Sequence, residues 1–180
     1  MPLFIEESYT AVLRGKLSRG QLDAIFIALP FTEPEVVTRP VYDEPFVVVL
    51  PQDHPLAGDK RVDPAALAEH RVLLMGEGHC FRDQVLEACP GLNQAIQDDY
   101  ASGHAIVEGS SLETLKHMVA TGLGITVLPR SAAELASYGG KTLVVREFVE
   151  PVPTRTIAIA WRVSYPRHQA IDTLAGVLQD

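Results

Sequence analysis

The sequence predicts an α/β fold, because helix-type and strand-type patterns alternate along its 180 residues. Apolar residues make up 47% of the chain, which is enough for a core in one domain or in two small lobes. The net charge is -8 and the basic residues are scattered, which argues against direct binding of nucleic acid. No apolar run approaches the ~20 residues of a membrane span and no signal-peptide pattern is present, so we expect a cytoplasmic protein without membrane contact.

The first part of the chain alternates between the two kinds of pattern. Residues 6–19 are predicted to form a helix ended by Gly20, because Tyr9, Leu13 and Leu17 recur at spacings of four. Residues 23–29 have the continuous apolar character of a buried strand of the parallel type. The other elements expected here are strands at 36–41 and 45–50, a turn at 51–55, a short helix at 64–68 and a strand at 71–75.

The second part begins with a weak pattern at residues 91–108, which indicates an exposed excursion. Ser110 and Ser111 then open a helix to residue 120, since serine is a favourable N-cap and an acidic residue lies in the first turn. Pro129 suits the first turn of a further helix to residue 136. The other elements expected here are strands at 125–128, 143–146 and 154–162 and an amphipathic helix at 166–178.

The two cysteines, Cys80 and Cys89, carry the clearest chemical signal. His79 and Arg82 flank Cys80 and can stabilise a thiolate. The glycine-containing segment before Cys80 indicates a turn into a helix N-terminus, which also favours an anion. Cys80 is therefore a candidate nucleophile, whereas Cys89 fits the ordinary pattern of a buried, inert thiol.

The spacing of the two cysteines indicates a switch rather than a permanent cross-link. Nine positions on a continuous α-helix correspond to a rise of about 13 Å, with the thiols on opposite faces. A disulfide needs Cα atoms about 4.4–6.8 Å apart, so pairing two thiols on one helical segment would require that segment to unwind. No zinc-ligand spacing accompanies the pair, and we expect neither a metal nor a cofactor.

Several segments resemble the effector-binding domain of LysR-type transcriptional regulators, over nearly the whole chain. They are residues 111–129, the motif Gly-His-Cys-Phe-Arg-Asp-Gln at 78–84 with the second cysteine at 89, and the shorter matches at 19–23, 43–45 and 155–157. The two-cysteine motif is similar to that of the members that sense hydrogen peroxide. The resemblance implies a periplasmic-binding-protein-like fold in which two α/β lobes are joined by crossover strands. Lobe I would comprise residues 1–43 and 158–180, and lobe II residues 44–157.

The resemblance also implies roles for individual residues. Cys80 would be the peroxidatic cysteine and Cys89 the resolving one. His79 and Thr10 match residues that position peroxide, and the matching polar surround is Arg82, Asp83 and Arg155. Thr10 and Arg155 also have ordinary interpretations, as a residue in the first turns of a helix and as a strand residue paired with an acid.

The partners implied by the resemblance are hydrogen peroxide, a thiol reductant such as glutaredoxin and further copies of the chain. The regulatory domains would form a homodimer, and the full-length regulator a homotetramer. The winged helix-turn-helix module, the linker helix, and the first strand and helix of lobe I match no part of this sequence. Promoter DNA and RNA polymerase would therefore be reached only through the full-length protein.

Two other functions fit parts of the same sequence. A LysR effector domain could bind a small metabolite between its lobes, with the helix N-terminus at Ser110 and Ser111 holding a carboxylate. A thiol peroxidase could use the same cysteine pair for repeated turnover with a reductant. We expect a sensor rather than an enzyme, because the cysteine motif matches regulators.

Overall fold

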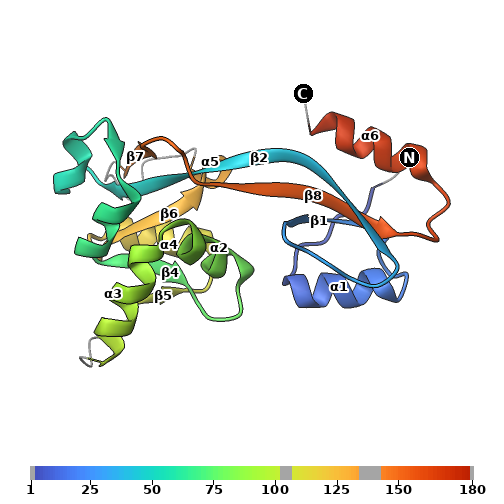
Figure 1. Cartoon of the computed structure of the whole chain (residues 1–180), viewed down its shortest axis with the longest axis horizontal. Coiled ribbons are helices and arrows are strands. Elements are labelled where there is room, and N and C mark those ends of the chain that lie inside the picture. Colours follow the sequence, from blue (N-terminus) through green and yellow to red (C-terminus); the bar gives the residue numbers. More distant parts are fainter. Residues whose placement is uncertain (1–2, 102–106, 134–142, 179–180) are drawn as a thin grey trace. The chain divides into compact units, whose positions relative to one another are not determined.

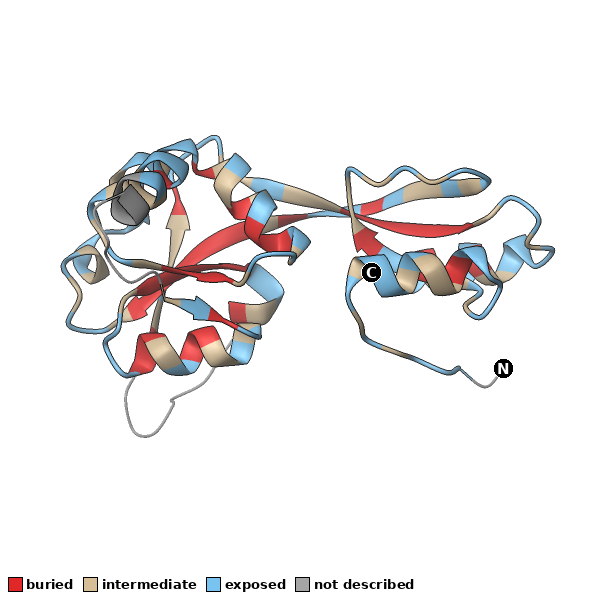
Figure 2. Cartoon of the chain, turned by 90° about the horizontal axis from the view of Figure 1, so that it is seen from below, coloured by how far each residue is buried: buried red, intermediate tan, exposed pale blue. Residues whose placement is uncertain are grey.

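A computed structural model describes residues 3–101, 107–133 and 143–178 (Figure 1). Helices and strands alternate along the chain, which confirms the predicted α/β class. The chain divides into two compact units, Met1–Asp43 with Arg155–Asp180 and Glu44–Thr154. The two long strands β2 (Val36–Pro51) and β8 (Thr154–Arg162) each contribute residues to both units. In each unit, buried residues gather along the strands and on one side of the helices (Figure 2).

The first unit contains α1 (Thr10–Ser18), β1 (Ala24–Ala28), α6 (His168–Val177), the first part of β2 and most of β8. β1 pairs antiparallel with β8, and in the described part of the chain it pairs with no other strand. Ile25 and Ile27 are buried, whereas Phe26 between them is 41% exposed. The prediction of a buried strand of the parallel type is therefore wrong. A short apolar run does not reveal how many faces of a strand are covered.

Helix α1 begins four residues later than the sequence predicts. The backbone is still extended at Tyr9, and this side chain is 57% exposed. Leu17 is fully buried, and Leu13 packs against the same cluster of residues. The predicted end is confirmed, since Gly20 follows the helix with φ of +74°, a conformation that favours glycine.

The second unit contains the rest of β2 and the elements between the two long strands. These are the short 3-10 helices η1 (Pro55–Gly58) and η2 (Pro64–Glu69), the helices α2 (Cys80–Ala88), α3 (Pro90–Ala101), α4 (Leu112–Ala120) and α5 (Arg130–Ala133), and the strands β3 (Arg61–Val62), β4 (Val72–Met75), β5 (Glu108–Gly109), β6 (Ile125–Pro129) and β7 (Leu143–Phe148). Its strands follow the order β2-β6-β4-β5, while β7 pairs with β2 and with β3. β4 lies parallel to both β5 and β6, and β6 is antiparallel to β2.

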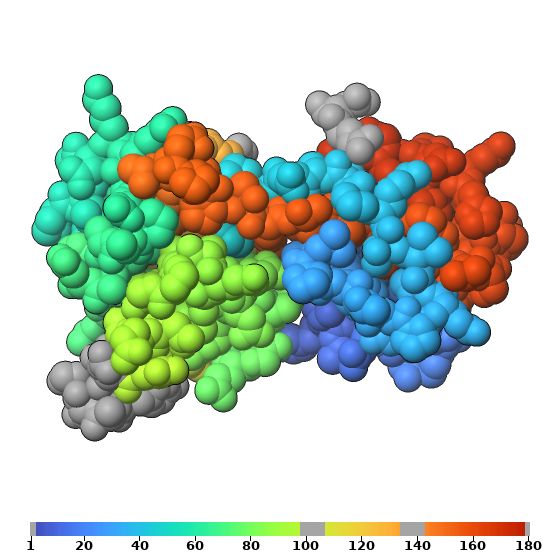
Figure 3. Space-filling model, viewed as in Figure 1, coloured from blue at the N-terminus to red at the C-terminus, as the bar shows by residue number. Residues whose placement is uncertain are grey.

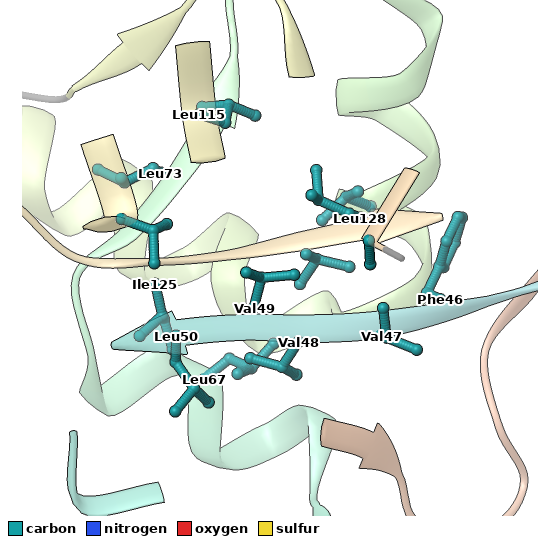
Figure 4. Close-up of a cluster of buried hydrophobic side chains, with 14 of the residues drawn as sticks. Phe46, Val47, Val48, Val49, Leu50, Leu67, Leu73, Leu115, Ile125 and Leu128 are labelled. Carbon is teal, nitrogen blue, oxygen red and sulfur yellow. The ribbon is translucent and has the colours of Figure 1, made fainter. Parts of the chain in front are cut away.

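The core of the second unit is built around β2. Residues 46–50 are all buried, since β2 pairs with β6 and β7 and is packed on both faces. Figure 4 shows Leu67 of η2 on one side of β2 and Leu115 of α4 on the other. Each fully buried side chain of this size stabilises the fold by about 1.5–3 kcal/mol. Helices α2 and α3 both pack against this core.

The sequence predicts two strands at 36–41 and 45–50, but the structure has one strand of 16 residues. The polar residues in the middle stay extended because they have tertiary partners. Thr156 donates a hydrogen bond to Asp43 at 2.6 Å, and the hydroxyl and backbone N–H of Ser131 donate to Glu44. These partners lie far away in the sequence, so the local pattern does not show them.

The predicted excursion at residues 91–108 is wrong up to residue 101, which α3 occupies. Pro90 stands at the first position of the helix, where its fixed φ is favourable. Leu92 is buried and Ile96, one turn later, packs against the same core. Residues 102–106 lie outside the described part of the chain.

Two further predictions concern α4 and α5, near the end of the second unit. Ser111 caps α4 as predicted, since its hydroxyl accepts from the N–H of Thr114 at 3.1 Å. Pro129 belongs to β6 and α5 begins at Arg130; the predicted extension of this helix beyond residue 133 falls outside the described residues. Within the described ranges, no helix has the length and apolar character needed to cross a membrane.

The packing of α3 predicts a clear contrast between two neighbouring substitutions. Leu92→Ala should lower the free energy of unfolding by about 2–5 kcal/mol, because a fully packed side chain is lost from the core. Asn93→Ala, at an exposed position of the same helix, should change it by less than about 0.5 kcal/mol. Urea unfolding followed by circular dichroism measures both, and equal losses would contradict the observed packing of α3.

Candidate redox site

Cys80 is the first residue of α2. Gly78, with φ of +87°, and the extended N-cap residue His79 lead the chain into the helix. The first turn closes when the N–H of Arg82 donates to the His79 carbonyl at 3.0 Å. The Cys80 side chain is exposed. The unpaired N–H groups of a helix N-terminus favour negative charge, so this position suits a thiolate.

Cys89 lies at the other end of α2, as its C-cap residue. Its side chain is fully buried in the core of the second unit. Burial raises the pKa of the Cys89 thiol to about 11, because the charged thiolate loses its hydration there. Cys89 is therefore a neutral, inaccessible thiol near neutral pH.

The two thiols are thus held apart by the whole length of one helix. Nine residues of α-helix rise about 13 Å, well beyond the Cα separation that a disulfide allows. Neither cysteine takes part in a disulfide in this conformation. In Figure 3 the residues of α2 and α3, green to yellow-green by the colour bar, form a continuous part of the surface. A bond between Cys80 and Cys89 requires α2 to unwind or to move out of this packing.

Three side chains near the start of α2 anchor it to the unit. Phe81 packs edge-to-face on Phe46 with ring centroids 5.7 Å apart, and Val85 is 1% exposed. Arg82 is also buried, and its Nη1 donates to the Met75 carbonyl at 3.1 Å. The same nitrogen forms an ion pair with the carboxylate of Glu108 on β5. The helix that carries Cys80 is therefore held by both apolar and charged contacts.

The structure places five of the residues singled out from the sequence in one segment of the second unit: His79, Cys80, Arg82, Asp83 and Cys89. Asp83 is exposed in the first turn of α2. Thr10, the first residue of α1, and Arg155, in β8, belong to the first unit. Their proposed part in binding peroxide stays a prediction.

Sequence reasoning did not identify Glu108 as part of the site. It lies 26 residues from Arg82 and follows a segment without a clear pattern, so no local spacing connects the two charges. A guanidinium buried on a helix needs an acidic partner, but this need becomes visible only once Arg82 is known to be buried. In the described ranges, no group of three or more His, Cys, Asp and Glu side chains is placed to hold a metal ion.

Comparison with known families shows to which family the chain belongs. The pattern of the LysR substrate binding domain matches residues 2–180. The chain belongs to the LysR substrate-binding domain family. Membership confirms the fold that the resemblance implied, and LysR domains are parts of transcription regulators.

Several proteins similar to this LysR domain have names or structures that refer to hydrogen peroxide. A probable hydrogen peroxide-inducible genes activator of Streptomyces viridosporus is 36% identical over 180 residues, which cover 100% of this chain and 56% of the activator. The chain thus spans about half the length of the curated relatives it matches. The reduced regulatory domain of OxyR from Pseudomonas aeruginosa is 52% identical, with a TM-score of 0.86 over 99% of this chain and 83% of that one. A cysteine mutant of OxyR from Corynebacterium glutamicum with hydrogen peroxide bound is 32% identical, with a TM-score of 0.81 over 96% of this chain and 52% of that one.

The burial of Cys89 predicts a loss of stability at alkaline pH. The folded-state pKa of about 11 lies above that of an unfolded thiol, so the stabilisation is complete below about pH 8.5 and is lost as the pH rises toward 11. Between pH 7.5 and 10.5, wild-type protein should lose about 2 kcal/mol more than Cys89→Ala, measured by urea unfolding under reducing conditions. Other titrating groups are the same in both proteins, and equal losses would contradict the buried, protonated thiol.

Proposed function

We propose that the chain is the redox-sensing regulatory domain of a LysR-type regulator, and that hydrogen peroxide is its signal. The observation that carries this proposal is the contrast between the two cysteines. One is exposed at a helix N-terminus, and the other is buried and protonated at the far end of the same helix. Similar proteins are hydrogen peroxide-inducible activators, and a related OxyR structure holds hydrogen peroxide.

The first step is oxidation of Cys80. The thiolate sulfur attacks one oxygen of the peroxide, an S–O bond forms, the O–O bond breaks and hydroxide leaves. The product is a sulfenic acid on Cys80, and the departing hydroxide takes up a proton. The His79 imidazole and the Thr10 hydroxyl are the proposed donors for this proton, with Arg82, Asp83 and Arg155 in the polar surround. These groups affect the rate of oxidation.

The second step joins the two cysteines. The Cys89 sulfur attacks the sulfenic sulfur of Cys80, an S–S bond forms and water leaves. In total, two thiols and one peroxide give one disulfide and two waters. Because Cys89 is buried and α2 separates the sulfurs, this step must follow opening of the helix. Exchange with a thiol reductant such as glutaredoxin would restore both thiols.

The refolded α2 segment would carry the signal to the rest of a full-length regulator. We propose that the regulatory domains pair as homodimers within a cytoplasmic homotetramer. A change in their packing would then reach promoter DNA and RNA polymerase through a DNA-binding module. One disulfide per signal fits a sensor better than a peroxidase, because the resolving thiol is stored in the core rather than kept at the surface.

Intact-mass measurement tests the chemistry and assigns the roles. With one equivalent of hydrogen peroxide, reduced wild-type protein should lose two hydrogen atoms, because both thiols enter a disulfide. Cys89→Ser should retain one added oxygen as the sulfenic acid, and Cys80→Ser should stay unchanged. An unchanged wild-type mass, under conditions in which a small free thiol is barely oxidised, would refute the proposed function.

The proposed role of His79 predicts a kinetic effect. His79→Ala should slow formation of the sulfenic acid by about 100-fold or more, because a donor of the leaving-group proton is lost. The final yield of disulfide should remain unchanged. Rapid-quench labelling of Cys80 measures the rate, and His70→Ala, a histidine outside the α2 segment, serves as the control. Equal rates for both variants would remove His79 from the proposed mechanism.

A further inference from the structure

Arg82 is a charged residue in a buried position, two residues after Cys80. Its side chain is 8% exposed, so its charge requires a partner within the protein. The guanidinium donates to the carbonyl of Met75, the last residue of β4, and to the carboxylate of Glu108. Arg82 thus closes the loop of residues 76–79 that connects β4 to α2 and carries His79.

Glu108 belongs to β5, which pairs with β4 at the edge of the sheet. The backbone N–H of Gly76 donates to the Gly109 carbonyl at 3.1 Å, so the start of the loop is fixed to the same strand. A Cβ atom at Gly76 would lie 3.5 Å from the Glu108 carboxylate, which places this carboxylate directly beside the loop. The ion pair therefore ties the first turn of α2 to the rigid sheet.

This pair is more buried than the exposed ion pair of Arg130 and Glu147 in the same unit. Arg130 and Glu147 form a comparable contact at 2.5 Å, but their side chains are 46% and 45% exposed. The values for Arg82 and Glu108 are 8% and 30%. Partly buried, charge-assisted contacts are stronger and more directional than exposed ones. Of these two, only the pair of Arg82 acts on the helix that separates the cysteines.

We propose that the ion pair between Arg82 and Glu108 is a latch that holds α2 in its reduced position and thereby sets the equilibrium between dithiol and disulfide. Arg82 lies between the two cysteines, so the rearrangement that joins them breaks its contacts with Met75 and Glu108. Stabilising the latched state favours the dithiol. Glu108 is accordingly a positioning residue for Cys80 that acts through Arg82. This inference rests on the proposed disulfide switch.

Hydrogen exchange on the reduced protein tests the latch without any oxidation. Glu108→Gln keeps the size and one acceptor of the side chain but removes its charge. Amide exchange in the first turns of α2 should become about tenfold faster in this variant, because the helix opens more often. Glu147→Gln, which removes the acid of the exposed pair, is the matched control and should leave exchange in α2 unchanged.

Equilibration with glutathione and its disulfide then tests the link to redox state. Two protein thiols and one glutathione disulfide give one protein disulfide and two glutathione thiols. Glu108→Gln should raise this equilibrium constant about tenfold, which makes the reduction potential about 30 mV more negative. Arg82→Lys should shift it in the same direction, since one ammonium does not replace the planar guanidinium.

The two measurements separate the possible failures. Unchanged exchange in Glu108→Gln would refute the latch. Faster exchange with an unchanged equilibrium constant would show that the contact only stabilises the fold, which also overturns the inference. A wild-type protein that forms no disulfide in any glutathione mixture would instead refute the proposed function, while the exchange data still decide whether Glu108 holds α2.

Discussion

Helix α2 separates its two cysteines by a fixed rise, and the candidate site is organised around this distance. Cys80 at the first position and Cys89 at the C-cap do not meet while the segment stays helical. Burial adds a second barrier, because Cys89 is kept neutral in the core. Oxidation of Cys80 can therefore precede any conformational change, whereas formation of the disulfide requires α2 to open.

Two kinds of contact hold α2, and they respond differently to its opening. Phe81 and Val85 bury apolar surface, which can be covered again in many other arrangements. The contacts of Arg82 with Met75 and Glu108 depend on direction and are lost after a small displacement. Apolar packing thus stabilises a folded segment in general, while the charged contact favours one particular position of it.

Local sequence predicted the start of α2 and the burial of Cys89, because the causes there are local. Glycine and polar residues precede Cys80, and apolar or small neighbours surround Cys89. Elements that depend on distant partners were predicted poorly. The middle of β2 has polar residues that pair with Ser131 and Thr156. In α3 the few apolar residues that face the core are separated by polar residues of the exposed face, so their helical spacing is hard to recognise in the sequence. Glu108 was missed for the same reason, since its partner is 26 residues away.

Detection and recovery would then be controlled by different parts of the site. In the proposed mechanism, oxidation by peroxide begins at an exposed thiol, so its rate depends on the immediate surroundings of Cys80. The proposed return to the dithiol is an exchange with cellular thiols, and a tenfold change in that equilibrium corresponds to only about 30 mV. A contact as small as one ion pair is sufficient for such a change. Glu108, which holds α2 through Arg82, can therefore adjust how readily the domain resets without being one of the residues proposed to meet peroxide.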